Sequence, residues 1–146
     1  MDDLKTVFIS YSHKDRELLE SLSRHFAPLK NKIDFWDDSK IYAGMKWKQE
    51  IDSALKKAKV AVLFLSADFF NSDFIMKNEL PFILEAEQNG LTVLSVLLKP
   101  CLFQFYEGIS QIQFIHDASK SIIQMTEAER ELVWTNLILR INDILY

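Results

Sequence analysis

The run VAVLFL (residues 60–65) is apolar at every position and consists of β-branched, aliphatic and aromatic residues. This composition is typical of a strand that is buried on both faces, as a central strand of a parallel sheet is. Similar strand patterns occur on either side of it in the chain. They are TVFISY (6–11), KIDFW (32–36), TVLSVLL (92–98) and a short segment around Gln113 to His116.

Helical patterns separate these strands. Apolar residues recur at helical spacing from Leu18 to Leu29, and KWKQEIDSALKKA (46–58) carries an apolar stripe that includes Trp47. The segment 69–88 is helix-like, and a capping box of Thr126 and Glu129 opens a last helix. The alternation predicts an α/β, flavodoxin-like, three-layer domain with a five-stranded parallel sheet and helices on both faces.

Composition excludes several classes of function. The 146 residues are 49% hydrophobic and 26% charged with a net charge of −4, which is typical of an ordinary soluble domain. The acidic balance argues against nucleic acid as a partner, and no apolar run reaches the roughly 20 residues of a membrane span. A lone Cys101 and three scattered histidines predict neither a disulfide nor a metal site. We expect a cytoplasmic protein that contacts no membrane.

Ligands of such sheets bind outside the carboxyl ends of the strands. This rule selects four segments as candidates for the site, which are 10–15, 37–47, 66–79 and 99–105. The sequence has no glycine-rich phosphate loop and no serine nucleophile elbow. A phosphoacceptor receiver domain is also excluded, because the first and third strands do not end in the acidic residues that would hold Mg²⁺.

Three segments, FISYSHKD (8–15), the span 35–66 that starts FWDDSKIYAG, and SDFIMKNEL (72–80), resemble a TIR (Toll/interleukin-1 receptor) domain of the bacterial, NAD-cleaving type. The resemblance covers about residues 5–145 and implies a five-stranded parallel sheet. It also implies that residues 1–146 are a single TIR domain. Bacterial domains of this kind are often fused to sensors, so the chain could be cut from a longer sensor–effector protein.

Members of this family that are enzymes cleave NAD⁺ at the nicotinamide–ribose bond with a glutamate in the helix after the third strand. Glu79 occupies that place, so the resemblance implies that it is catalytic. The enzymes commonly have a tryptophan four residues earlier. Here Ile75 stands at that spacing, and Phe74 precedes it. NAD⁺ is expected as the substrate, and no cofactor is expected.

A single carboxylate suits this reaction. Breaking the bond gives a ribosyl cation, and nicotinamide leaves as a neutral ring that needs no general acid. Pro81 is compatible with the first turn of a helix that begins near Asn78, which would place Glu79 at the positive helix end and keep it ionised. The alternative is that Glu79 merely caps this helix.

The resemblance implies five substrate-binding residues, and all of them except Tyr11 have a simpler alternative. Tyr11 and Ser12 end the first strand, where Ser12 could equally be a helix N-cap. Asp37 could bind ribose or only form a turn, and Gly44 most simply supplies a special backbone conformation. Trp47 could stack on a base, although its place on the apolar stripe favours core packing.

The expected function is that of an NAD⁺ glycohydrolase that releases nicotinamide and either ADP-ribose or a cyclic ADP-ribose. The product depends on whether water or an adenine nitrogen attacks. The resemblance further implies activation by self-association with other TIR domains through the 37–47 loop, in bacterial immune defence. The alternative is a non-catalytic scaffold or signalling adaptor that binds TIR domains without turnover.

Overall fold

The computed structural model describes residues 4–146, so the first three residues of the expected domain lie outside it. Its sheet has five strands, all parallel, in the order β2-β1-β3-β4-β5. The predicted fold is therefore confirmed, and strand ends differ from the predicted ones by one or two residues. The strands are β1 (Lys5–Ser10), β2 (Ile33–Trp36), β3 (Ala58–Leu65), β4 (Thr92–Leu97) and β5 (Gln113–Phe114).

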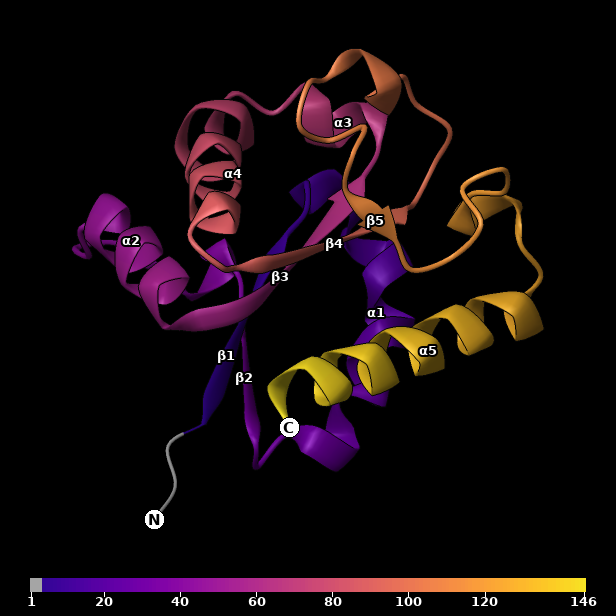
Figure 1. The fold of residues 1–146 in the computed structure, drawn as a ribbon, viewed down its shortest axis with the longest axis horizontal. Helices are drawn as coiled ribbons and strands as arrows, with labels where there is room; N and C mark the ends of the chain where they lie inside the picture. Colours follow the sequence, from indigo (N-terminus) through magenta and orange to yellow (C-terminus); the bar gives the residue numbers. More distant parts are fainter. Residues whose placement is uncertain (1–3) are drawn as a thin grey trace.

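Helices cover both faces of the sheet (Figure 1). One face carries two helices, α2 (Trp47–Lys57) and α4 (Leu80–Gln88), and the other carries α1 (Arg16–His25) and α5 (Glu127–Leu145). A short helix, α3 (Ala67–Phe70), follows the central strand. The three layers are those that the alternating pattern predicts.

Strand β3 explains why this sequence forms two cores. Its alternate residues point to opposite faces, so Ala61, Leu63 and Leu65 belong to the core under α2 and α4. Val60, Val62 and Phe64 belong to the core under α1 and α5. The apolar run therefore supplies both layers at once, which fixes β3 at the centre of the sheet.

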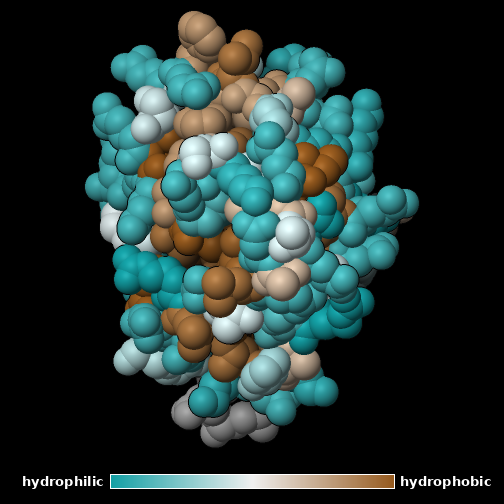
Figure 2. All heavy atoms as spheres, turned by 90° about the vertical axis from the view of Figure 1, so that its right-hand side faces the viewer, coloured by the Kyte–Doolittle hydropathy of each residue, from teal (hydrophilic) through white to brown (hydrophobic). Residues whose placement is uncertain are grey.

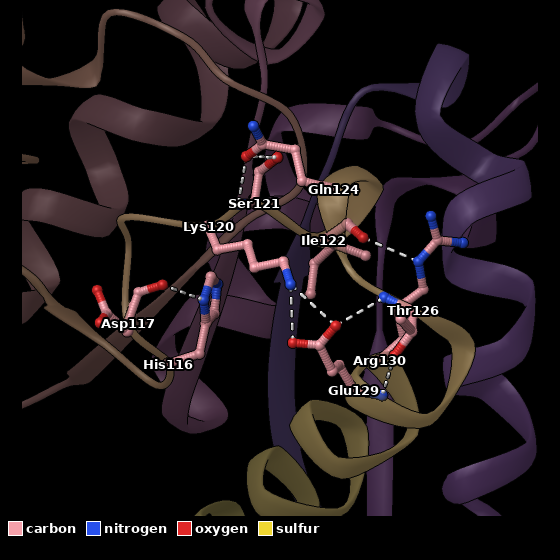
Figure 3. Close-up of polar contacts among 9 residues, drawn as sticks. All are labelled: His116, Asp117, Lys120, Ser121, Ile122, Gln124, Thr126, Glu129 and Arg130. Carbon is pink, nitrogen blue, oxygen red and sulfur yellow. Dashed lines mark hydrogen bonds and ion pairs between the residues drawn. The ribbon is translucent and has the colours of Figure 1, made fainter.

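The predicted capping box of α5 is present. Thr126 Oγ1 accepts a hydrogen bond from the Glu129 backbone at 3.2 Å, and Glu129 Oε1 accepts one from the Thr126 backbone at 2.9 Å (Figure 3). Lys120 also contacts both oxygens of the Glu129 carboxylate at 2.9 Å. These contacts orient the start of the longest helix in the described residues.

Ser12 and Asp15 form no capping box at the start of α1. Ser12 instead caps a single 3₁₀ turn, His13–Asp15, and its Oγ accepts from the Lys14 backbone at 3.3 Å. Helix α1 begins only at Arg16, and Asp15 makes no side-chain cap at its start. The extra turn directs the Asp15 carboxylate inward, where it contacts Ser66 and Lys99.

Among residues 4–146, no helix is both long and apolar enough to cross a bilayer. Figure 2 shows the face at the right of Figure 1, where apolar and polar side chains are interspersed. Scattered apolar side chains of this kind are common on folded domains.

Candidate functional site

A cavity of about 540 Å³ lies at the carboxyl edge of the sheet. Its wall is formed by the turn after β1, the 37–47 loop after β2, and the segment after β3, which are three of the four segments that topology selects. Tyr11, Ser12 and Trp47, three of the predicted substrate-binding residues, line it. The structure therefore brings these three side chains together in one cavity.

Two aromatic residues form part of the wall. The rings of Trp47 and Phe74 meet edge to face with centroids 5.6 Å apart. Trp47 is 41% exposed, so the expectation of core packing is wrong. The reason is that Trp47 is the first residue of α2, and the buried residues of this helix start one turn later at Ile51.

The chain between Phe74 and α4 is a π turn, Ile75–Glu79, in which the Leu80 N–H donates to the Ile75 carbonyl five residues back. Pro81 gives a physical reason, because its ring would clash with the carbonyl of residue 77 in a regular α-helix. A π turn holds one residue more than an α turn and is frequent at functional sites. Phe74, five residues before Glu79, thus reaches the cavity wall and supplies the aromatic surface.

Glu79 is 1% exposed and lies behind this wall. Ser10 Oγ, at the end of β1, donates a hydrogen bond to Glu79 Oε1 at 2.8 Å. The other carboxyl oxygen, Oε2, is buried and accepts no hydrogen bond from residues 4–146, and the neighbouring Asp38 carboxyl can pair with it only while one of the two acids holds a proton. Glu79 precedes α4 but makes no side-chain cap there, so the capping alternative does not describe its contacts.

The expectation that Glu79 stays ionised is wrong for this state of the domain. Burial first, and then the nearby Asp38 carboxyl, raise its pKa to about 9, although the Ser10 hydrogen bond acts in the opposite direction. The field of the first turn of α4 is too weak to offset the loss of hydration. Glu79 is therefore mainly protonated at neutral pH.

Asp38 is the residue of the site that the sequence interpretation missed. It lines the cavity with a side chain that is 12% exposed, and His13 Nε2 contacts its Oδ1 at 2.6 Å. Its neighbour Asp37 accepts a hydrogen bond from the Ser39 backbone at 2.8 Å and forms the turn, which is one of the two roles that the sequence left open for it, and it does not line the cavity. The doublet Asp37-Asp38 is the sequence signal that could have revealed Asp38. Only one of two adjacent acids can cap the turn, so the other is left for another role.

The remaining predicted residues have local roles. Gly44 has φ +92°, the left-handed conformation that favours glycine, and it does not line the cavity. Ser12 caps its turn and also faces the cavity, so both roles proposed for it stay open. Burial and the nearby Asp37 raise the pKa of Tyr11, which remains a neutral phenol on the wall.

Comparisons with known proteins agree with this architecture. The model of the TIR-domain family matches residues 7–133. Uncharacterized protein y4lF of Sinorhizobium fredii is 32% identical over 101 residues, which are 67% of this chain and 31% of that protein. The chain thus spans about a third of that relative's length. The TIR domain of the Toll-related receptor TRR-2 from Hydra magnipapillata shares the fold, with a TM-score of 0.61 and 18% identity over 93% of this chain and 97% of that one.

Proposed function

Because the chain belongs to the TIR-domain family, we propose that it is an NAD⁺ glycohydrolase with Glu79 as its catalytic carboxylate. One observation carries this proposal. Glu79 is buried beside a cavity with an aromatic wall, and one of its two oxygens accepts no hydrogen bond from any described residue. Buried polar groups with a purely structural role are nearly always hydrogen-bonded, and perturbed carboxyl groups concentrate at functional sites.

The reaction needs few groups from the protein. The bond between ribose C1′ and the cationic ring nitrogen breaks, and its electron pair leaves with neutral nicotinamide. Water adds to C1′ and loses a proton, which gives ADP-ribose, and attack by an adenine nitrogen gives the cyclic product instead. An ionised Glu79 stabilises the positive charge that develops on the ribose. The proton that Glu79 holds at neutral pH must therefore leave before the bond breaks.

Other residues of the cavity suit parts of this substrate. Trp47 and Phe74 offer aromatic faces and edges to a planar ring. Lys14 lines the same cavity and carries the charge that a diphosphate requires. Ser10 fixes one oxygen of Glu79, so that Oε2 is left for a ribose hydroxyl or for the cation itself.

A non-catalytic scaffold that binds other TIR domains is a second candidate. The observation in its favour is that Glu79 does not line the cavity in this state, whereas Asp38 from the 37–47 loop does. In the enzymatic proposal, the same observation means that the loop must shift before substrate reaches Glu79. Association with other TIR domains through this loop would supply that shift, in the setting of bacterial immune defence.

Replacement of Glu79 tests the enzymatic proposal. Wild type and Glu79→Gln are compared for nicotinamide release from NAD⁺ at high protein concentration, with Glu85→Gln as the control because Glu85 is an exposed glutamate of α4. We expect turnover to fall by about 10²-fold or more in Glu79→Gln, as for loss of one electrostatic contact in the transition state, and to be unchanged in Glu85→Gln. An active Glu79→Gln protein would exclude the catalytic assignment.

Dilution separates the two candidates. If association moves the 37–47 loop, the rate per molecule should rise with protein concentration or with a crowding agent, because more domains are then paired. The measurement is specific activity over a dilution series, with oligomeric state followed by light scattering. A wild type that forms oligomers and still releases no nicotinamide would favour the scaffold.

A further inference from the structure

Asp38 and Glu79 come from different elements, and their carboxyl groups lie within hydrogen-bonding reach of each other. Asp38 comes from the 37–47 loop after β2, and Glu79 ends the π turn before α4. Asp38 faces the cavity, and Glu79 lies behind the wall with Oε2 buried and accepting no hydrogen bond from the described residues. Asp38 is therefore the acid of the pair that lies nearer to the cavity.

The side chain of Asp38 is held in position by His13. His13, in the turn after β1, contacts Asp38 Oδ1 at 2.6 Å, and the His13 ring packs against Tyr11 with centroids 5.7 Å apart. His13 thus holds one carboxyl oxygen of Asp38 in place. This contact keeps the Asp38 side chain on the wall of the cavity.

The other charged groups around this pair are of both signs. Lys14 and Asp68 lie on the cavity wall, and Asp37 adds a weaker negative field to Glu79. Tyr11 is uncharged at neutral pH, because burial and the neighbouring acids raise its pKa. The negative field at Glu79 therefore comes mainly from Asp38.

We propose that Asp38 is a positioning residue for Glu79: the two carboxyl groups share one proton, and a ligand with a positively charged pyridinium ring releases that proton to water. The choice of ligand class rests on the proposed function. The step involves no bond other than the O–H bond of Glu79, whose electrons stay on the carboxylate.

Two adjacent carboxylates in a site with little water cannot both ionise, and the pair then titrates as a unit. Glu79 is the deeper of the two and has the raised pKa, so it carries the proton. A cationic ring beside it supplies the missing positive charge and stabilises the doubly ionised pair. Glu79 then becomes negative when a cationic substrate arrives, and a neutral ring leaves it protonated.

The Glu79 side-chain carboxyl ¹³C resonance, followed by NMR during a pH titration of the whole chain, tests this directly. The resonance is assigned by its loss in Glu79→Gln. We expect a midpoint far above that of an ordinary glutamate in wild type, lowered by about one pH unit or more in Asp38→Asn. Asp68→Asn, which removes another acid of the cavity wall, should leave the midpoint unchanged. Asp38→Ser serves as a second variant if the asparagine protein does not fold.

Two small probes test the response to charge. 1-Methylnicotinamide, a pyridinium cation, should lower the Glu79 midpoint in wild type, and neutral nicotinamide at the same concentration should not. An ordinary midpoint in wild type, an unchanged midpoint in Asp38→Asn, or equal effects of the two probes would each overturn the proposal.

This outcome is separate from that of the proposed function, because the titration uses no NAD⁺ and detects no turnover. A shared proton in a protein that leaves NAD⁺ intact would refute the enzymatic function alone. An active enzyme whose Glu79 titrates normally would refute only the role of Asp38. In an active enzyme with a shared proton, Asp38→Asn should also shift the pH profile of kcat/KM toward lower pH.

Discussion

Asp15 and Glu79 are both 1% exposed and lie at the same edge of the sheet, yet their surroundings are opposite. Asp15 accepts a hydrogen bond from Ser66 Oγ at 2.5 Å and pairs with Lys99 Nζ at 2.9 Å. Glu79 has one hydrogen bond, from Ser10, and an acid, Asp38, as its charged neighbour.

The difference separates a carboxylate whose charge the fold compensates from one whose charge it leaves uncompensated. Asp15 follows β1, Ser66 follows β3 and Lys99 follows β4, so the first cluster joins the ends of three strands and balances its charge. Glu79 gains no such compensation from the fold. A buried acid without a positive partner destabilises a protein, and it is a feature expected where a ligand supplies the missing charge.

The largest effect is expected from breaking the balanced cluster. Lys99→Met removes the positive partner of Asp15 and leaves a buried carboxylate unpaired. Such a loss costs about 3–5 kcal/mol when both partners are buried, and because the Lys99 side chain is 34% exposed we expect about 2–3 kcal/mol. Urea denaturation measures it, with Lys48→Met, an exposed lysine of α2, as the control. Equal losses in the two variants would mean that the ion pair contributes nothing.

Replacement of Glu79 should have the opposite effect to replacement of Lys99, because it should stabilise the folded domain at high pH. Since its pKa in the folded domain is raised to about 9 from 4.5, the folded state holds a proton that the unfolded state releases between these values. Stability from this group is therefore present at low pH and lost as pH rises through the window, with a slope of at most about 1.4 kcal/mol per pH unit. Glu79→Gln should be more stable than wild type at pH 8 and nearly equal at pH 5. Denaturation of both at the two pH values measures this, and parallel curves would contradict the buried, protonated state.

Much of the fold could be predicted from the sequence, because the order of strands and helices follows from apolar runs and their periods. The run 60–65 alone places β3, since only a central strand needs both faces apolar. Thr126 and Glu129 likewise form their capping box, because all its contacts lie within one turn of the chain.

The site was predictable only in part, since its decisive contacts join distant segments. The pairing of Glu79 with Ser10, 69 residues away, and with Asp38 depends on how three loops meet, which no local period encodes. Trp47 shows the same limit, because its apolar stripe is real but the stripe is buried only from Ile51 onward. The π turn before Pro81 is a backbone adjustment that simple helical spacing does not describe.

The smallest effect concerns His116, a titratable side chain that the fold keeps neutral. Its Nε2 accepts a hydrogen bond from the Leu97 backbone at 3.0 Å, and its Nδ1 donates to the Asp117 carbonyl at 3.0 Å (Figure 3 shows the second contact). Burial lowers the pKa of His116 below 6.5, so the unfolded chain binds a proton that the folded domain resists. Stability from this group is present above about pH 6.5 and lost as pH falls, which is opposite in sign to Glu79. Protonation also removes the acceptor for Leu97 at the end of β4.

The amide oxygen of His116→Gln can replace that acceptor. We therefore expect this variant to lose about 0.5–1.5 kcal/mol less free energy of unfolding than wild type when the pH falls from 7 to 5. Denaturation at both pH values measures the difference, and equal losses would show that His116 is free to take up its proton in the folded domain.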